Sequence, residues 1–223
     1  MSIGIGLIVP DGVILIADGR KGYPQSANSH VIDDADKLIP LDDHIFTIPL
    51  GVVWATDLAT LVLKSSLKSS SSPASIQDAV YTSLKLAWNQ FLMRLASDVN
   101  INHPTMKAAL IVGGISQNES FIAYCLHGSG VDLEPILITD SYKFIVLGGE
   151  EHKSNLHFAD QLKVIMKEDA RDFSEGPFNR FIERILEAAN NTIRHIEGLD
   201  SSIGGVIKYT IIRKDFPVIH DNI

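Results

Sequence analysis

The stretch Ser2–Arg20, SIGIGLIVPDGVILIADGR, decides the fold of this chain. Two short apolar runs, Ile3–Val9 and Val13–Ala17, flank the turn sequence PDG. Apolar runs separated by Pro, Asp and Gly are typical of strands that are joined by a tight turn. We therefore predict an antiparallel hairpin that begins almost at the first residue.

Beyond the hairpin, apolar runs between turn formers predict strands, and apolar residues at helical spacing predict helices. The polar stretch Gly19–Ser29 predicts a loop, and the residues after Arg213 predict a short tail. The expected strands are Val31-Ile32, Lys37–Leu41, His44–Val53, Ala108–Ile115, Ser120–Leu126, Glu134–Thr139, Lys143–Leu147 and Gly204–Arg213. The expected helices are Thr56–Leu67, Ile76–Leu95 with Ser75 as its N-cap, Lys153–Met166 and Pro177–Ile196.

This order of elements indicates an α+β protein. Two antiparallel sheets stacked face to face, with a helix pair on each outer face, would bury all the apolar faces at once. A length of 223 residues fits one domain of generous size. We therefore expect a single domain over residues 1–223 with a four-layer αββα sandwich architecture.

Composition narrows the class of protein. The chain has 19 Lys and Arg against 27 Asp and Glu, a net charge of −8, so it has no broad electrostatic reason to bind nucleic acid. No apolar run approaches the ~20 residues that span a membrane, and the first residues do not have the pattern of a secretion signal. The expectation is a cytoplasmic protein that contacts neither nucleic acid nor membrane.

Several residue groups give weaker signals. Cys125, the only cysteine, lies in an apolar run, which favours a buried and inert thiol. Glu150, Glu151, His152 and His157 could bind a metal, but a solvated helix start explains the acidic pair better. Gly113-Gly114 follows a strand without opening a helix, so it predicts no phosphate loop. We expect no metal and no cofactor.

Ser2 is of interest because of its position. Initiator methionine is generally removed before a small residue, which would leave Ser2 with a free α-amino group. An α-amino group has a pKa near ~7.7–8.0, so it can act as a general base on the hydroxyl of its own residue. Taken alone, a serine after Met1 carries little weight, because many proteins begin this way.

The residues after Ser2 add weight. The sequence SIGIG, the PDG turn and the strand that ends in Asp18-Gly19-Arg20 resemble the start of mature proteasome β-subunits and of the related bacterial HslV peptidase. These are N-terminal-nucleophile (Ntn) hydrolases, in which a threonine at the first position is the nucleophile. The spacing to Asp18 puts Ser2 on that threonine without a gap.

Later segments are similar to further landmarks of the same family and cover nearly the whole chain in order. They are Asp36-Lys37-Leu38 with the turn Asp42-Asp43, the stretch Ile48–Leu61, the strand end Ala109–Gly114 and the loop Asp200–Gly205. The lysine lies about three residues later than in typical members, which implies a longer loop before it. No single segment is specific, but their joint spacing is.

The resemblance implies a role for each matching residue. Ser2 is the nucleophile, Lys37 lowers the pKa of its hydroxyl, and Asp18 orients Lys37. Asp200 holds the amine end of the site. Without the resemblance, Asp18 could merely end a strand, Lys37 could be a solvated charge and Asp200 could be a turn residue.

The resemblance also implies a substrate-binding side of the site. The backbone N–H of Gly51 is the expected donor to the oxyanion, and Arg20 is the second residue expected on this side. A shift of one residue would place Leu50 there instead, where its side chain would crowd the substrate.

Three departures from the family pattern bear on activity. Serine replaces threonine, so the methyl group that restricts χ1 is lost. The two serines that usually flank the amine are also absent. The position of the first serine lies within Gly148-Gly149-Glu150, and the position of the second is occupied by Ile203.

The leading hypothesis is a hydrolase that cleaves amide or peptide bonds through Ser2. The resemblance implies a homo-oligomer that forms a ring or a related assembly and acts on a peptide or protein substrate. An unidentified ATPase is a candidate further partner. The second hypothesis is a non-catalytic subunit of the same fold with a structural or binding role. The third is an Ntn amidohydrolase that acts on small amides.

Overall fold

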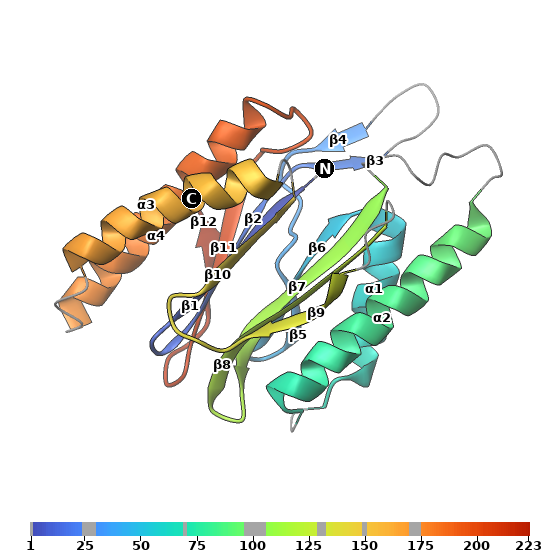
Figure 1. Ribbon diagram of the computed structural model, residues 1–223, viewed down its shortest axis with the longest axis horizontal. Helices are drawn as coiled ribbons and strands as arrows, with labels where there is room; N and C mark the ends of the chain where they lie inside the picture. The colour runs from blue at the N-terminus through green and yellow to red at the C-terminus, as the bar shows by residue number, and fades with distance from the viewer. Residues whose placement is uncertain are drawn as a thin grey trace.

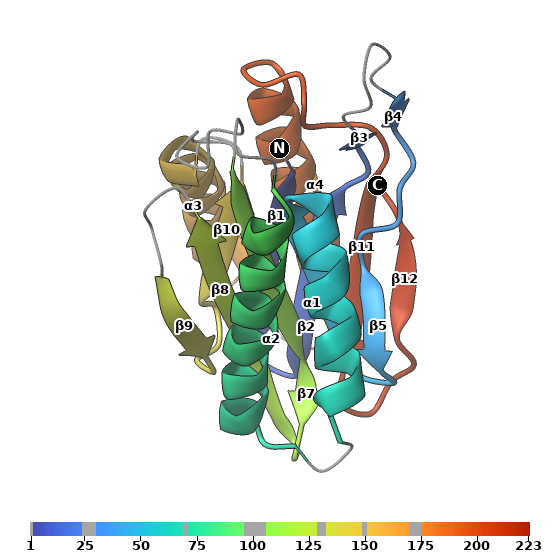
Figure 2. The same cartoon turned by 90° about the vertical axis from the view of Figure 1, so that its right-hand side faces the viewer.

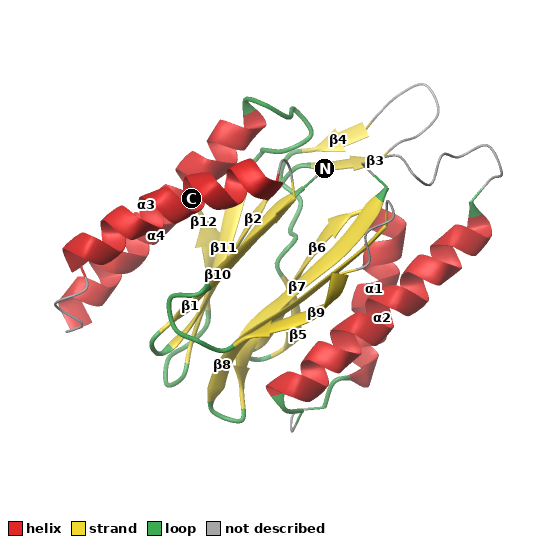
Figure 3. Ribbon diagram, viewed as in Figure 1, coloured by secondary structure: helices red, strands yellow, loops and turns green. Residues whose placement is uncertain are grey.

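The computed structural model describes residues 2–23, 30–68, 71–95, 106–128, 133–148, 151–169 and 175–223. Within these ranges the chain is an α+β protein with two five-stranded antiparallel sheets, a two-stranded ribbon and four helices. Figure 1 shows the two sheets lying between two pairs of helices, and Figure 3 shows the same arrangement coloured by element type. The α+β class is therefore confirmed.

The first sheet, sheet I, contains the hairpin expected from the opening of the sequence. Its strand order is β10 (Phe144–Gly148), β1 (Ile3–Val9), β2 (Gly12–Asp18), β11 (Ile207–Arg213) and β12 (Ile219–Asn222). β1 and β2 pair from Gly4↔Ala17 to Val9↔Gly12, so the hairpin prediction is confirmed. This register brings Asp18 opposite the start of β1.

The second sheet, sheet II, follows the chain order. Its strands are β5 (Ile39–Asp42), β6 (Ile45–Gly51), β7 (Lys107–Ser116), β8 (Glu119–Gly128) and β9 (Leu133–Ile138). The ribbon pairs β3 (Lys21–Tyr23) with β4 (His30–Ile32). Each sheet is antiparallel throughout.

The helices cover the outer faces of the sheets. Helices α1 (Val53–Ser66) and α2 (Pro73–Arg94) bury their apolar sides against sheet II, in front of which they lie in Figure 2. Helices α3 (Glu151–Asp169) and α4 (Glu175–Glu197) do the same for sheet I.

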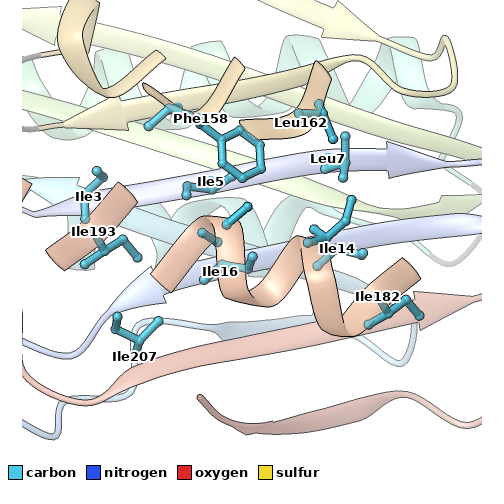
Figure 4. Close-up of a cluster of buried hydrophobic side chains, with 14 of the residues drawn as sticks. Ile3, Ile5, Leu7, Ile14, Ile16, Phe158, Leu162, Ile182, Ile193 and Ile207 are labelled. Atoms are coloured by element: carbon cyan, nitrogen blue, oxygen red, sulfur yellow. The ribbon is translucent and has the colours of Figure 1, made fainter. Parts of the chain in front are cut away.

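The strands of sheet I contribute side chains to two different apolar layers. Ile3, Ile5 and Leu7 of β1 point toward α3 and α4, and Figure 4 shows Ile5 and Leu7 beside Phe158 and Leu162, and Ile3 beside Ile193. Other strand residues face the opposite way into a layer between the two sheets, formed by residues such as Ile8, Leu15, Ile48, Ile111 and Ile122. Both faces of the first hairpin are therefore buried, which explains why its runs are almost continuously apolar.

Several boundary predictions were wrong. Ser72, not Ser75, is the N-cap of α2, because Pro73 takes the first helical position and the Ser72 hydroxyl accepts the N–H of Ser75 at 3.2 Å. The expected loop Gly19–Ser29 contains strand β3, while residues 24–29 lie outside the described ranges. The expected tail contains β12, which pairs with β11.

Among the described residues, no helix is both long enough and apolar enough to cross a membrane.

Candidate active site

Ser2 lies immediately before β1, at the end of sheet I where strand β2 finishes in Asp18. The backbone N–H of Ile3 donates a hydrogen bond of 2.9 Å to Oδ1 of Asp18. This bond fixes the backbone next to Ser2 to the neighbouring strand. The hairpin register therefore sets the distance between Ser2 and Asp18.

Lys37 joins these two residues. Its Nζ donates to Oγ of Ser2 at 2.9 Å and to Oδ1 of Asp18 at 2.8 Å. Asp18 is fully buried and Lys37 is only 4% exposed. The structure thus brings together three of the four residues that the sequence predicts as catalytic.

Burial shifts both ionisable groups of this cluster toward their neutral forms. Burial lowers the pKa of Lys37, although the neighbouring Asp18 carboxylate opposes the shift. Burial likewise raises the pKa of Asp18 against the opposing effects of Lys37 and of two backbone N–H donors. A lysine with a lowered pKa is more readily present as the neutral amine, which can accept a proton.

Backbone bonds hold the segment that carries Lys37. Ala35 donates its N–H to the carbonyl of Gly19 at 2.8 Å, and the carbonyl of Asp33 accepts the N–H of Val206 at 2.8 Å. Leu38, the next residue after Lys37, is buried in the layer between the sheets. The segment is therefore fixed on both sides, which positions the ammonium group without a regular strand.

The loop between α4 and β11 completes the surroundings of Asp18. Gly204 donates its N–H to Oδ2 of Asp18 at 3.2 Å. Neither oxygen of this buried carboxylate lacks a donor, because Oδ1 accepts from Ile3 and Lys37. Gly204 lies in the loop Asp200–Gly205 that resembles a family landmark, but its bond to a partner 186 positions away was not predicted.

Asp200, expected at the amine end of the site, is bonded within its own loop. Its carboxylate accepts bonds from the N–H and the hydroxyl of Ser202, at 2.9 and 2.6 Å, and its own N–H continues the end of α4 by donating to Ile196. Burial raises the pKa of Asp200, but the Ser202 bonds outweigh it, so this pKa lies below its ordinary value. Within the described part of the chain, the carboxylate is bonded to Ser202 and not to Ser2.

Arg20 ties three segments together. Its Nε pairs with Asp33 at 2.6 Å, and its Nη1 donates to the carbonyls of Ser201 and Ile203, both at 2.8 Å. Its Nη2 lies 3.3 Å from a carboxylate oxygen of Glu197. The guanidinium therefore holds the loop that carries Gly204, in addition to lining the pocket described next.

A pocket of about 350 Å³ opens beside Ser2. It is lined by Ser2, Arg20, Lys21, Val31, Asp33, Gly51, Val53, Ser201 and Ser202. Gly51 lies in this lining, whereas Leu50 is buried between the sheets. Gly51, the first of the two alternatives, therefore lines the same pocket as Ser2.

The departures from the family pattern have structural counterparts. Ile203, at the position of one missing serine, is fully buried in the layer under α3 and α4. Gly149 and Glu150, where the other serine would fall, lie outside the described residues. Gly148 pairs with Ile3 at a φ of 98°, and a side chain there would collide with the carbonyl of Ser2.

Cys125 and His157 do not join the site, and the side chains of Glu151 and His152 lie outside the described part of the structure. Cys125 is buried in the apolar layer under α1 and α2, as its sequence context predicts. His157 of α3 stacks on His195 of α4 with ring centroids 4.6 Å apart, and its Nδ1 lies 3.0 Å from the Thr192 hydroxyl. These histidines thus form part of the contact between two helices.

The comparisons with known proteins add no assignment. No family model matches the chain, and no curated protein matches its sequence. The geometry around Ser2 is therefore the main guide to the function.

Proposed function

We propose that this chain is a serine-type Ntn hydrolase that cleaves amide or peptide bonds through Ser2. One observation carries the proposal: Nζ of the buried Lys37 lies 2.9 Å from the Ser2 hydroxyl and 2.8 Å from Asp18. Nucleophile, base and orienting acid within hydrogen-bond reach are the arrangement that covalent catalysis by a hydroxyl needs. The helix pairs outside two stacked sheets also fit the four-layer αββα architecture of Ntn hydrolases.

The chemistry follows from this geometry. Oγ of Ser2 attacks the carbonyl carbon of the substrate, and its proton passes to a neutral amine, either Nζ of Lys37 or the α-amine of Ser2 after Met1 is removed. The proton then goes to the leaving nitrogen as the C–N bond breaks, which leaves an ester on Ser2. Water hydrolyses this ester by the same proton transfers in reverse.

The surroundings stabilise the developing charges. Asp18 is held by three donors, so it keeps Lys37 directed at the hydroxyl. Gly51 in the pocket lining is the proposed source of a backbone N–H for the oxyanion. Burial of Lys37 keeps water away from the proton path and lowers its pKa.

The same proposal includes the state of the protein in the cell. We expect a cytoplasmic homo-oligomer that forms a ring or a related assembly and whose substrates are peptides or proteins. An unidentified ATPase is a candidate further partner. Size-exclusion chromatography with light scattering tests the assembly, since a stable species near the chain mass of 24.4 kDa contradicts it.

One observation favours the second candidate, a non-catalytic subunit of the same fold. Asp200 is bonded to Ser202, and Ile203 occupies the place of a serine, so the α-amine of Ser2 would have fewer partners than in the family. If the α-amine is the essential base, this loss weakens catalysis. If Lys37 is the base, the loss matters less.

Labelling separates the two candidates. Protein from its native host is analysed by intact mass for Met1 and is then treated with a fluorophosphonate. We expect one adduct on Ser2 in the wild type and none in Ser2→Ala, with Ser75→Ala, a serine at the distant start of α2, as the matched control. Equal labelling of wild type and Ser2→Ala contradicts the proposed nucleophile. The absence of any adduct on folded protein without Met1 favours the non-catalytic subunit.

A further inference from the structure

The pocket beside Ser2 has two cationic residues and one anionic residue in its lining. Arg20 and Asp33 neutralise each other, because Nε of Arg20 lies 2.6 Å from the Asp33 carboxylate. The other cation of the lining is Lys21, on β3, whose acidic partner lies outside the lining. The rest of the lining consists of apolar Val31 and Val53, of Gly51, and of serines.

Lys21 already binds a carboxylate by a contact that can be exchanged. Its Nζ lies 3.5 Å from Oδ1 of Asp57 on α1, and the Asp57 side chain is 48% exposed. An ion pair of this length, between partly exposed groups, contributes little to stability. A carboxylate that enters the pocket would compete with Asp57 for Lys21.

The pocket is large enough to take one side chain. Its volume of about 350 Å³ lies near the lower end of the ~300–1,000 Å³ that small-molecule sites span. Because Ser2 is part of the lining, the group that fills the pocket must adjoin the carbonyl that Ser2 attacks. Val31 and Val53 can contact the methylene groups of such a side chain, and Lys21 can contact its end.

We propose that Lys21 makes this pocket selective for an acidic side chain, so that the enzyme prefers amide substrates with a glutamate-like carboxylate next to the scissile carbonyl. This inference rests on the proposed function, because it names the substrate class of the same site. It assigns to Lys21 a role in specificity, while Ser2, Lys37 and Asp18 perform the reaction.

The lowered pKa of Lys37 agrees with the position of Lys21 in the pocket lining. Burial is the main cause of the lowered pKa of Lys37, and the charge of Lys21 lowers it further. Lys21 is therefore close enough to influence the residue that contacts the nucleophile. Replacing Lys21 will alter the rate for every substrate through Lys37, so only the ratio between two substrates reports on binding in the pocket.

The first experiment measures that ratio. N-acetyl coumarin amides of Glu, Gln, Leu and Arg are compared by kcat/KM in wild type, Lys21→Ala and Lys21→Glu. We expect the Glu-over-Gln ratio to be about tenfold in the wild type, the size of one charge-assisted contact, near one in Lys21→Ala and inverted in Lys21→Glu. Lys163→Ala, which removes the same charge from the exposed Lys163–Asp160 pair, should leave the ratio unchanged. An unchanged ratio in all variants overturns the proposal.

A second experiment does not need turnover. The Ser2→Ala protein is titrated with N-acetylglutamate α-amide and with N-acetylglutamine α-amide, which differ only in side-chain charge, and binding is followed by NMR. We expect the glutamate compound to bind roughly tenfold more tightly, and Lys21→Glu in the same background to reverse the order. Equal affinity, or no binding of either compound, overturns the specificity proposal. If Ser2 is not labelled but the protein still binds the glutamate compound more tightly than the glutamine compound, only the proposed hydrolase activity is overturned.

Discussion

The backbone N–H of Gly204 donates a 3.2 Å hydrogen bond to Oδ2 of Asp18, and the two residues are 186 positions apart. Ile3 and Lys37 donate to the other oxygen of the same carboxylate, both within 2.9 Å. One buried acid thus joins the first strand, the segment that carries Lys37 and the loop after α4. Several testable consequences arise from this junction and from its neighbours.

Removal of the Asp18 carboxylate should destabilise the fold strongly. In Asp18→Ala the buried Lys37 loses its counter-ion, and breaking a buried pair on one side costs about 3–5 kcal/mol. Urea unfolding measures this loss. The double variant Asp18→Ala/Lys37→Met should recover most of it, because neither charge is then buried. If the double variant is as unstable as the single one, the loss comes from packing and not from charge.

The pH dependence of Ser2 labelling should report on Lys37. The neutral amine is the base, and burial lowers the pKa of Lys37, so the labelling rate should rise with pH around a midpoint below the ~10.4 of a free lysine. In Asp18→Asn the negative charge that raises the pKa of Lys37 is gone. The midpoint should therefore move to lower pH while the plateau rate falls. A midpoint that moves upward contradicts the assignment of Lys37 as base.

Arg20 should act as a positioning residue. In Arg20→Ala the carbonyls of Ser201 and Ile203 lose their donor, so the loop that brings Gly204 to Asp18 loosens. We expect faster amide hydrogen exchange over residues 199–206 and a labelling rate lower by roughly tenfold. Arg20→Lys should rescue little, because one ammonium cannot reproduce the planar fork.

The control for Arg20 is Arg194→Ala. It removes the exposed 2.7 Å pair with Glu197 and leaves the contacts of Arg20 in place. Exchange over residues 199–206 and the labelling rate should stay at wild-type values. If Arg194→Ala has the same effect as Arg20→Ala, the relevant partner is Glu197, and the two carbonyls do not matter.

Gly51→Ala should be poorly tolerated. Gly51 has a φ of 94°, which favours glycine, and an added Cβ would collide with the carbonyl of Lys107. A residue other than glycine in such a conformation costs about 1–3 kcal/mol, so the Tm should fall clearly. Gly198→Ala, where the nearest atom to an added Cβ is 3.3 Å away, should lower the Tm much less. Similar losses at both positions would contradict the role of backbone conformation at Gly51.

Most elements of the fold could be predicted because their signals are local. The PDG turn between two apolar runs fixes the β1–β2 hairpin, and helical spacing fixes the existence of four helices. β12 was missed because its burial is low on every residue, so its sequence has no apolar run. The start of α2 was missed because several serines compete for the N-cap, and Pro73 decides between them.

The candidate site was predictable only in part. Asp18 and Lys37 were found through the resemblance of their segments to a known family pattern, and the structure brings both into contact with each other and Lys37 into contact with Ser2. The partners of Arg20 and the donor Gly204 were not found, because their contacts span more than 180 positions and involve backbone atoms. Asp200 was expected from the same resemblance, and its carboxylate accepts hydrogen bonds from Ser202, two residues later.

The contact between Lys37 and the Ser2 hydroxyl joins two side chains and does not involve the α-amine. Sheet pairing and the bonds of Asp18 hold the same hydroxyl in position, again without the α-amine. The hydroxyl and its lysine can therefore be in place before Met1 is removed. If the α-amine is the base, removal of Met1 is the step that starts activity, and if Lys37 is the base, the folded chain is active with or without Met1.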